Sequence, residues 1–84
     1  MNYSVSIKQS AFKALAKIDQ PQRQRLFDAI EKLKITPTAG SVLKGEFSGL
    51  RRIRVGNYRI VYEVQDAQLV ILVIRVAHRK EVYK

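Results

Sequence analysis

The sequence lacks cysteine and has a single histidine, and both shortages restrict its chemistry. Without cysteine there is no disulfide framework, no thiol nucleophile and no cysteine-based zinc site. One histidine cannot form the histidine pair that many metal sites use, and the 7 acidic residues form few clusters. We therefore expect no metal centre and no bound cofactor.

Long apolar segments are also missing. The longest apolar run extends from Leu69 to Ile74, which is far shorter than the ~20 residues of a membrane-spanning helix. The N-terminal residues alternate between polar and apolar and lack the continuous apolar stretch of a signal peptide. From these absences we expect a cytoplasmic protein.

Positive charge is what the sequence has in excess. It contains 16 Lys and Arg against 7 Asp and Glu, for a net charge of +9 over 84 residues. Its hydrophobic content of 46% is too high for a disordered basic tail. The length predicts one domain over residues 1–84, with a thin core and little room for an enclosed substrate pocket. The charge favours an anionic partner: nucleic acid, an anionic membrane surface or an acidic protein.

The apolar pattern predicts two helices and four strands. Alternation over residues 2–8 predicts a strand, and helical spacing predicts one helix over about 10–18 and another from Pro21 until Pro37 ends it. Further strands are predicted at 50–55, 58–64 and 69–77. This order predicts an α+β fold in which an antiparallel helix hairpin covers one face of a mostly antiparallel sheet. The last strand is apolar on both faces, so we expect it to lie inside the sheet.

The apolar residues also predict what fills the core. We expect Phe12 on the buried face of the first helix and Ile35 at the end of the buried face of the second. Two glycines argue against regular structure over residues 42–49. From this connection Leu43 and Phe47 are expected to reach into the core.

The turn at Gly56-Asn57 predicts the register of a hairpin. A two-residue loop with glycine first is typical of a type II′ turn, which sets Val55 opposite Tyr58 and Arg54 opposite Arg59. The side of this hairpin that faces the helices should carry Ile53, Val55, Tyr58, Ile60 and Tyr62. The other side should carry Leu50, Arg52, Arg54, Arg59, Val61 and Glu63.

Three arginines on one sheet face suggest a binding site for an anion. Like charges directly opposite each other destabilise a sheet, so Arg54 and Arg59 are costly unless a polyanion binds them. Arginine is also suited to bidentate contacts with phosphate. The alternative interpretation of Arg52, Arg54 and Arg59 is an ordinary exposed face on which Glu63 and water screen the charge.

The C-terminal segment places three more candidate residues near the end of the last strand. On its own, His78 reads as an exposed strand-end histidine, and Tyr83 as a residue that covers the edge of the core. Next to Arg79 and the three hairpin arginines, they also fit a catalytic or base-stacking role.

Two strings of residues resemble RelE-type toxins of the RelE/ParE superfamily. One combines Leu43-Lys44-Gly45 with the hairpin Leu50-Arg51-Arg52-Ile53-Arg54-Val55-Gly56-Asn57-Tyr58-Arg59-Ile60-Val61-Tyr62-Glu63-Val64. The other is the ending Val73-Ile74-Arg75-Val76-Ala77-His78-Arg79-Lys80-Glu81-Val82-Tyr83. The resemblance implies the toxin of a type II toxin–antitoxin pair, an endoribonuclease that needs no metal and cleaves mRNA in the ribosomal A site. It also implies a cognate antitoxin, acidic and partly disordered, that binds the toxin in a hetero-oligomer.

The resemblance also implies roles for individual residues. The two basic strand residues of the family correspond to Arg52 and Arg54, and its transition-state arginine corresponds to Arg59. Its second arginine corresponds to Arg79, which would hold the scissile phosphate or assist the leaving group. Its tyrosine corresponds to Tyr83, which would stack on a base or orient the nucleotide.

One departure from the family leaves the general base open. Some members have lysines where this chain has Arg52 and Arg54, and an arginine effectively never loses its proton. Histidine is the residue type best suited to accept and donate a proton, and His78 is the only histidine in the sequence, so we hypothesise that it takes part in proton transfer. Two other functions remain alternatives: a ParE-like toxin that poisons DNA gyrase without enzymatic activity, and a plain RNA-binding domain.

Overall fold

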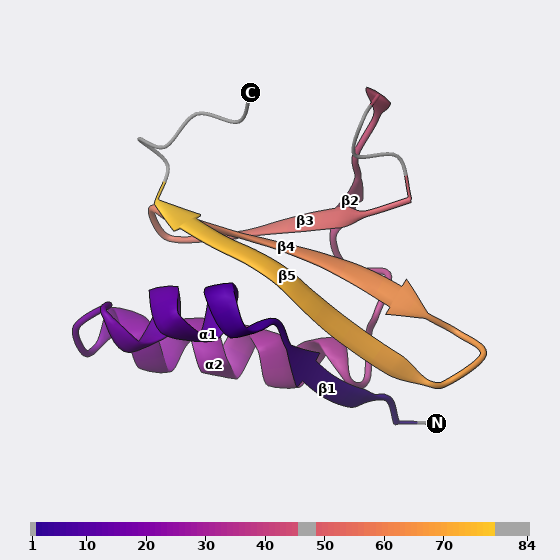
Figure 1. The fold of residues 1–84 in the computed structure, drawn as a ribbon, viewed down its shortest axis with the longest axis horizontal. Helices are drawn as coiled ribbons and strands as arrows, with labels where there is room; N and C mark the ends of the chain where they lie inside the picture. The colour runs from indigo at the N-terminus through magenta and orange to yellow at the C-terminus, as the bar shows by residue number, and fades with distance from the viewer. Residues whose placement is uncertain (1, 46–48, 79–84) are drawn as a thin grey trace.

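The computed structural model describes residues 2–45 and 49–78, which form two helices and one sheet (Figure 1). The elements are β1 (Ser4–Ile7), α1 (Gln9–Ala16), α2 (Gln22–Leu33), β2 (Ser41–Val42), β3 (Arg51–Val55), β4 (Tyr58–Gln65) and β5 (Val70–His78). The sheet has the order β1-β5-β4-β3-β2, with β1 parallel to β5 and every other pair antiparallel. The predicted α+β fold is confirmed, and β5 lies inside the sheet as expected. No helix among the described elements is long and apolar enough to cross a membrane.

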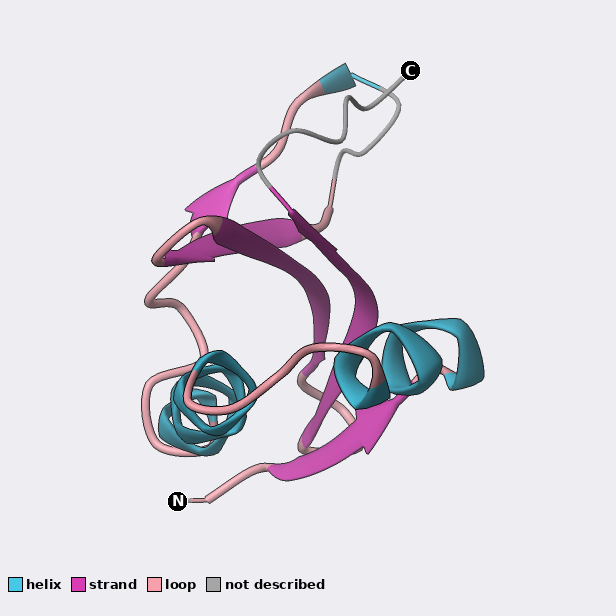
Figure 2. Ribbon diagram, turned by 90° about the vertical axis from the view of Figure 1, so that its left-hand side faces the viewer, coloured by secondary structure: helices cyan, strands magenta, loops and turns pink. Residues whose placement is uncertain are grey.

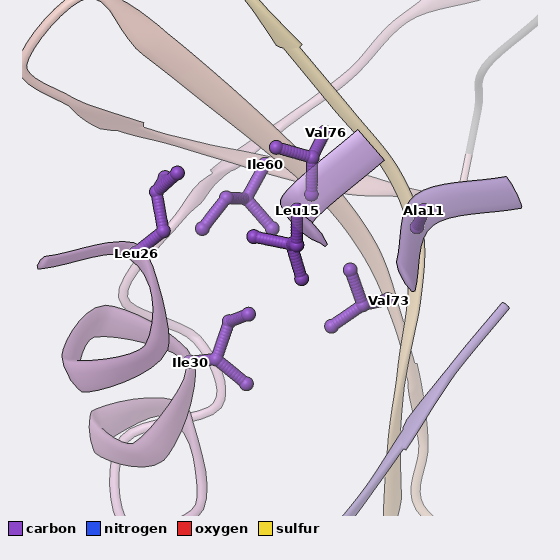
Figure 3. Packing of buried hydrophobic residues seen from close by; sticks show 7 residues of the cluster. All are labelled: Ala11, Leu15, Leu26, Ile30, Ile60, Val73 and Val76. Carbon is purple, nitrogen blue, oxygen red and sulfur yellow. The ribbon is translucent and has the colours of Figure 1, made fainter. Parts of the chain in front are cut away.

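Both helices pack against the same face of the sheet. Ala11 and Leu15 of α1 and Leu26 and Ile30 of α2 join one buried cluster with three strand residues. Figure 3 shows these side chains converging between the helices and the strands, with Ile60, Val73 and Val76 on the sheet side. The sheet curves around α2, which is seen nearly end-on in Figure 2. This packing leaves the opposite face of the sheet without a helix among the described elements.

Two apolar residues predicted for the core are exposed instead. Phe12 is 55% exposed and Ile35 is 73% exposed. The helix α1 has only eight residues and buries one narrow stripe, Ala11 and Leu15, so the adjacent Phe12 turns away from the core. Ile35 follows the end of α2 at Leu33 and therefore no longer continues its apolar face.

The connection before β3 contains a short strand that the sequence did not predict. Ser41 pairs with Arg52 and Val42 pairs with Arg51, and the Leu43 N–H donates to the Leu50 carbonyl oxygen over 2.9 Å. Positive φ angles occur at Gly45 (72°) and Gly49 (92°), so the glycines belong to the turn that follows β2 rather than to the strand. The expectation of no regular structure was therefore wrong at residues 41–42.

Of the two residues in this connection that were expected to reach into the core, only Leu43 is among the described residues. Leu43 is half-buried and belongs to neither buried cluster, so the prediction that it fills the core was wrong. It lies beside an edge strand, beyond the area that the two helices cover. Phe47 lies outside the described residues.

A buried tyrosine attaches the loop before β2 to the sheet. The side chain of Tyr62 is fully buried, and its hydroxyl donates to the Pro37 carbonyl oxygen (2.8 Å) and accepts from the Gly40 N–H (2.9 Å). The Arg51 guanidinium donates to the Gly40 carbonyl oxygen over 2.8 Å. A Cβ at Gly40 would lie 2.7 Å from both the Arg52 carbonyl oxygen and the Tyr62 hydroxyl, so only glycine fits there. These contacts hold β2 beside β3 and define the edge of the sheet.

Candidate nucleic-acid interface

The β3–β4 hairpin has the register that its turn predicts. Val55 pairs with Tyr58, Arg54 pairs with Arg59, and Arg52 pairs with Val61. Gly56 has a φ of 59°, whereas Asn57 is not among the residues with positive φ, which fits a type II′ turn and excludes type I′. The two arginines directly opposite each other are thus a consequence of a short, well-defined turn.

Alternation along the hairpin sorts its side chains as expected. Ile53, Val55 and Tyr58 pack against the core cluster and therefore face the helices. Arg52, Arg54 and Arg59 lie between them in the alternation, so they project from the opposite face. Arg54 is exposed, whereas Arg52 and Arg59 are half-buried. The structure thus brings the three predicted hairpin arginines together on one face.

A β-bulge adds a fourth arginine that sequence reasoning missed. The pairing of β4 with β5 shifts between Val61 and Tyr62, so that Tyr62 pairs with Val73 but Val61 pairs with Arg75. A register counted straight from the turn at 65–68 would have set Arg75 opposite Ile60, facing the helices. The shift instead places Arg75 beside Val61 on the outer face, where it is exposed. One signal was available: the straight register points the charged Arg75 toward the helices and the core, which is costly for an unpaired charge.

We call these four residues, Arg52, Arg54, Arg59 and Arg75, the arginine face. They form two rows across the sheet, one of Arg54, Arg59 and Ala77 and one of Arg52, Val61 and Arg75. Neighbouring strands are about 4.8 Å apart, so each row places its charges within about 10 Å. The arginine face therefore has a strongly positive electrostatic potential, which suits a chain of phosphates better than a single small anion.

A shallow depression lies at the hairpin end of the arginine face. It has a volume of about 170 Å³ and is lined by Arg54, Gly56, Asn57, Tyr58 and Arg59. Arg54 and Arg59 each carry a planar guanidinium with several N–H donors, which matches the geometry of a phosphate group. The site can therefore bind a phosphate and stabilise added negative charge, but the arginines offer no base that accepts a proton.

The structure separates His78 from the arginine face. His78 pairs with Tyr58 across β4 and β5, and the two rings meet edge to face at a centroid distance of 5.1 Å and an angle of 89°. Because Tyr58 faces the helices, His78 lies on that side as well. His78 therefore lies at the same end of the sheet as the arginines, as expected, but on the opposite face. Arg79 and Tyr83 lie outside the described residues.

Metal ligands do not gather at this end of the sheet. Within residues 2–45 and 49–78, no group of three or more His, Asp or Glu side chains could hold a metal ion.

Comparison with known proteins gives a consistent family assignment. The sequence pattern of the family described as the ParE toxin of the type II toxin–antitoxin system, parDE, matches residues 5–83. An Escherichia coli protein described as a RelE-like toxin is 30% identical over 82 residues, covering 95% of this chain and 86% of that protein. Toxin RelG of Mycobacterium tuberculosis is 33% identical over 45 residues, which is 54% of this chain and 52% of the relative. That match therefore spans about half the length of the relative.

Solved structures show the same fold. The RelBE2 toxin–antitoxin complex of Mycobacterium tuberculosis contains a chain that superposes with a TM-score of 0.86 at 27% identity. The superposition covers 94% of this chain and 100% of that one. The fold described above is therefore shared with a chain of a toxin–antitoxin complex.

Proposed function

This chain belongs to the ParE toxin family of type II toxin–antitoxin systems, within the RelE/ParE superfamily, and we propose that it is a toxin that cleaves mRNA on the ribosome. The arginine face is the observation that carries this proposal. Four arginines on one sheet face, two of them directly opposite each other, oppose folding through repulsion. An RNA strand turns that repulsion into binding energy.

The proposed reaction uses the 2′-hydroxyl of the RNA as its nucleophile. The 2′-oxygen forms a new bond to phosphorus, and the bond from phosphorus to the 5′-oxygen breaks. Negative charge builds up on the phosphoryl oxygens in the transition state, and positive groups held around it lower the barrier. Arg59, half-buried and opposite Arg54, is our choice for this role, with Arg54 and Arg52 binding the neighbouring phosphates. Arg79 and Tyr83 keep the proposed roles of assisting the leaving group and stacking on a base.

Proton transfer requires a group that the arginine face does not contain. We keep His78 as the candidate, and its position defines what that role demands. Its ring lies on the helix side of the sheet end, against Tyr58, so an RNA strand on the arginine face would have to pass around the end of the sheet to reach it. Replacing His78 with alanine tests the role: mRNA cleavage on ribosomes at an unchanged rate would exclude it.

The shape of the surface fits a substrate that another molecule holds in place. The arginine face and its 170 Å³ depression are open rather than enclosed, so they cannot by themselves align a flexible RNA for reaction. A ribosome that holds the mRNA in its A site would supply that alignment. The proposal accordingly places the toxin in the cytoplasm, inhibiting translation, with an acidic antitoxin as its inhibitory partner.

A second function deserves a direct comparison, because the matching family is described as the ParE toxin. In this alternative the chain poisons DNA gyrase through protein contacts. The arginine face would then be a protein-binding or DNA-contacting surface without chemistry of its own. A plain RNA-binding domain is the third alternative.

Cell-free translation of a defined mRNA distinguishes these functions. We expect the wild-type chain to produce cuts, mapped by primer extension, that require ribosomes. The double substitution Arg54→Gln and Arg59→Gln should abolish the cuts, whereas Arg23→Gln and Arg25→Gln on α2 remove the same charge from another part of the protein and should preserve them. Gyrase-dependent DNA breaks without mRNA cuts would support the ParE-like alternative. Salt-sensitive RNA binding with neither activity would support the binding domain.

A further inference from the structure

A second depression lies on the helix side of the same sheet end. It is formed between the C-terminal end of α1 and the paired ends of β4 and β5, and it has a volume of about 270 Å³. Its lining residues are Ala14, Lys17, Ile18, Tyr58, Val76 and His78. We call it the Tyr58 groove. Of its lining residues, only His78 has a proposed role, which is proton transfer.

The lining of the Tyr58 groove combines flat rings, apolar walls and one cation. Tyr58 and His78 meet edge to face, so that the edge of one ring points at the face of the other. Ile18 and Val76 supply apolar surface, and the Lys17 ammonium lies on the exposed end of α1. A nucleobase has flat apolar faces and polar edges, and proteins that bind single strands recognise it with this set of groups.

The Tyr58 groove continues the arginine face around the hairpin tip. Tyr58 lines both the groove and the depression that contains Arg54 and Arg59. Gly56 and Asn57 lie exposed at the tip between them, where the Gln22 side chain at the start of α2 lies beside Gly56. The two depressions are therefore adjacent parts of one path that is positively charged at both ends.

We propose that the Tyr58 groove binds one base of the RNA strand whose phosphates lie on the arginine face, with Lys17 contacting the phosphate next to that base. The proposal rests on the proposed function, because it takes RNA as the ligand. It gives His78 a binding role at the base edge, separate from proton transfer. The positive charge of Lys17 agrees with a phosphate of this RNA strand as its ligand. The direct continuity of the groove with the four arginines agrees with the same ligand.

Nuclear magnetic resonance titration tests the groove without cleavage. The labelled chain is titrated with a 2′-O-methyl RNA tetranucleotide, which has no 2′-hydroxyl to attack the phosphate. Saturable shifts are expected at Lys17, Tyr58 and His78 together with the arginine face. Inorganic phosphate, used as an anion without a base, should shift the arginine face and Tyr58, which lines the depression there, but should leave Ile18 and His78 unchanged. Shifts confined to the arginine face in both titrations would overturn the proposal.

Matched variants separate a binding role from a structural one. Lys17→Gln should weaken binding of the tetranucleotide and reduce the slope of log affinity against log salt by about 0.7, the value for one phosphate contact on a single strand. Lys13→Gln, an exposed change one turn earlier on α1, should leave both unchanged. His78→Phe, which keeps a flat ring, should bind more tightly than His78→Ala. Equal binding by the Lys17 and Lys13 variants would contradict the proposal.

The same variants show whether the groove or the proposed function has failed. If Lys17→Gln binds the tetranucleotide and cleaves mRNA on ribosomes as the wild type does, the groove is not part of the RNA site although the function stands. If the wild type cleaves no mRNA but the tetranucleotide still shifts the groove, the groove proposal stands and the nuclease fails. Groove shifts produced by an acidic antitoxin peptide and not by RNA would assign the groove to the antitoxin and overturn the proposal.

Discussion

At the scale of single residues, one buried hydroxyl does much to define the edge of the sheet. Tyr62 has no exposed surface, yet its hydroxyl makes two hydrogen bonds to the loop before β2. A buried tyrosine is stable only if its hydroxyl finds partners, and here both partners are backbone groups. Tyr62 therefore stabilises the fold that presents the arginine face, without being part of that face.

Replacing Tyr62 with phenylalanine should lower the free energy of unfolding by about 1–3 kcal/mol, because the Gly40 N–H and the Pro37 carbonyl lose their partner. Urea denaturation measures this change. Tyr3→Phe serves as the control, because the hydrogen bond from Tyr3 to Asp66 is exposed and its loss should matter little. Equal stabilities of the Tyr62 and Tyr3 variants would contradict the assigned role.

The same tyrosine predicts a dependence of stability on pH. Burial raises the pKa of Tyr62 above its usual value of 10.0, so the folded state favours the neutral phenol. Its contribution is complete below pH 10 and is lost as the pH rises through the raised pKa, since the unfolded chain then ionises first. Tyr62→Phe should lack this part of the alkaline loss of stability. Parallel curves for the two proteins above pH 10 would show that Tyr62 is not the group involved.

A third prediction at this scale concerns the charge pair across the hairpin. Arg54→Gln should raise the free energy of unfolding by about 0.2–1 kcal/mol at low salt, because it relieves repulsion from the directly opposite Arg59. The gain should shrink as salt screens the pair, and RNA binding should weaken in the same variant. Thermal denaturation at two salt concentrations measures it. A less stable Arg54→Gln protein at low salt would mean that no such cost exists.

At the scale of elements, the register of the β3–β4 hairpin could be predicted, whereas the register of β5 against β4 could not. A two-residue turn with glycine first determines which residues face each other, so Arg52, Arg54 and Arg59 were placed correctly from local chemistry. The bulge in β5, opposite Val61 and Tyr62 of β4, depends on how helices and strands pack together, and it moved Arg75 to the outer face. The two-residue strand β2 was missed for a similar reason: its pairing depends on the Tyr62 contacts rather than on its own residues.

The position of Arg75 after the bulge gives the prediction at this scale. Arg75→Gln should weaken binding of single-stranded RNA and reduce the slope of log affinity against log salt by about 0.7, as expected for one lost phosphate contact. Arg25→Gln, an exposed arginine on α2, removes the same charge away from the arginine face. If the two variants bind alike, net charge rather than the placement of Arg75 governs binding.

At the scale of the whole molecule, the excess positive charge lies in two regions, the helices and the open face of the sheet. The helices and the residues that flank them carry five lysines and two arginines, whereas the side of the sheet away from the helices carries the four arginines. The sequence was enough to predict an anionic partner and three of these arginines. It could not show that His78 faces the helices, because the face of a strand-end residue depends on the bulge several residues before it. The proposed roles of Arg79 and Tyr83 remain predictions.

A small domain with an open site also explains why the ribosome belongs to the proposal. The thin core leaves no enclosed pocket at the arginine face, so alignment of the RNA must come from outside the toxin. The toxin then needs only to add positive charge and proton transfer at one phosphate. The two layers of the fold agree with this division of work between toxin and ribosome, because the helices and core support the sheet from one side and leave its other face open to RNA.

The most direct test of this account is the rate of single-turnover cleavage of mRNA bound to purified ribosomes. We expect Arg59→Gln to slow cleavage by about 10²-fold or more, the typical effect of removing one group that stabilises transition-state charge. Arg25→Gln should cleave at the wild-type rate. Equal rates for the wild type and Arg59→Gln, with both proteins folded, would contradict the arginine face as the site of RNA cleavage.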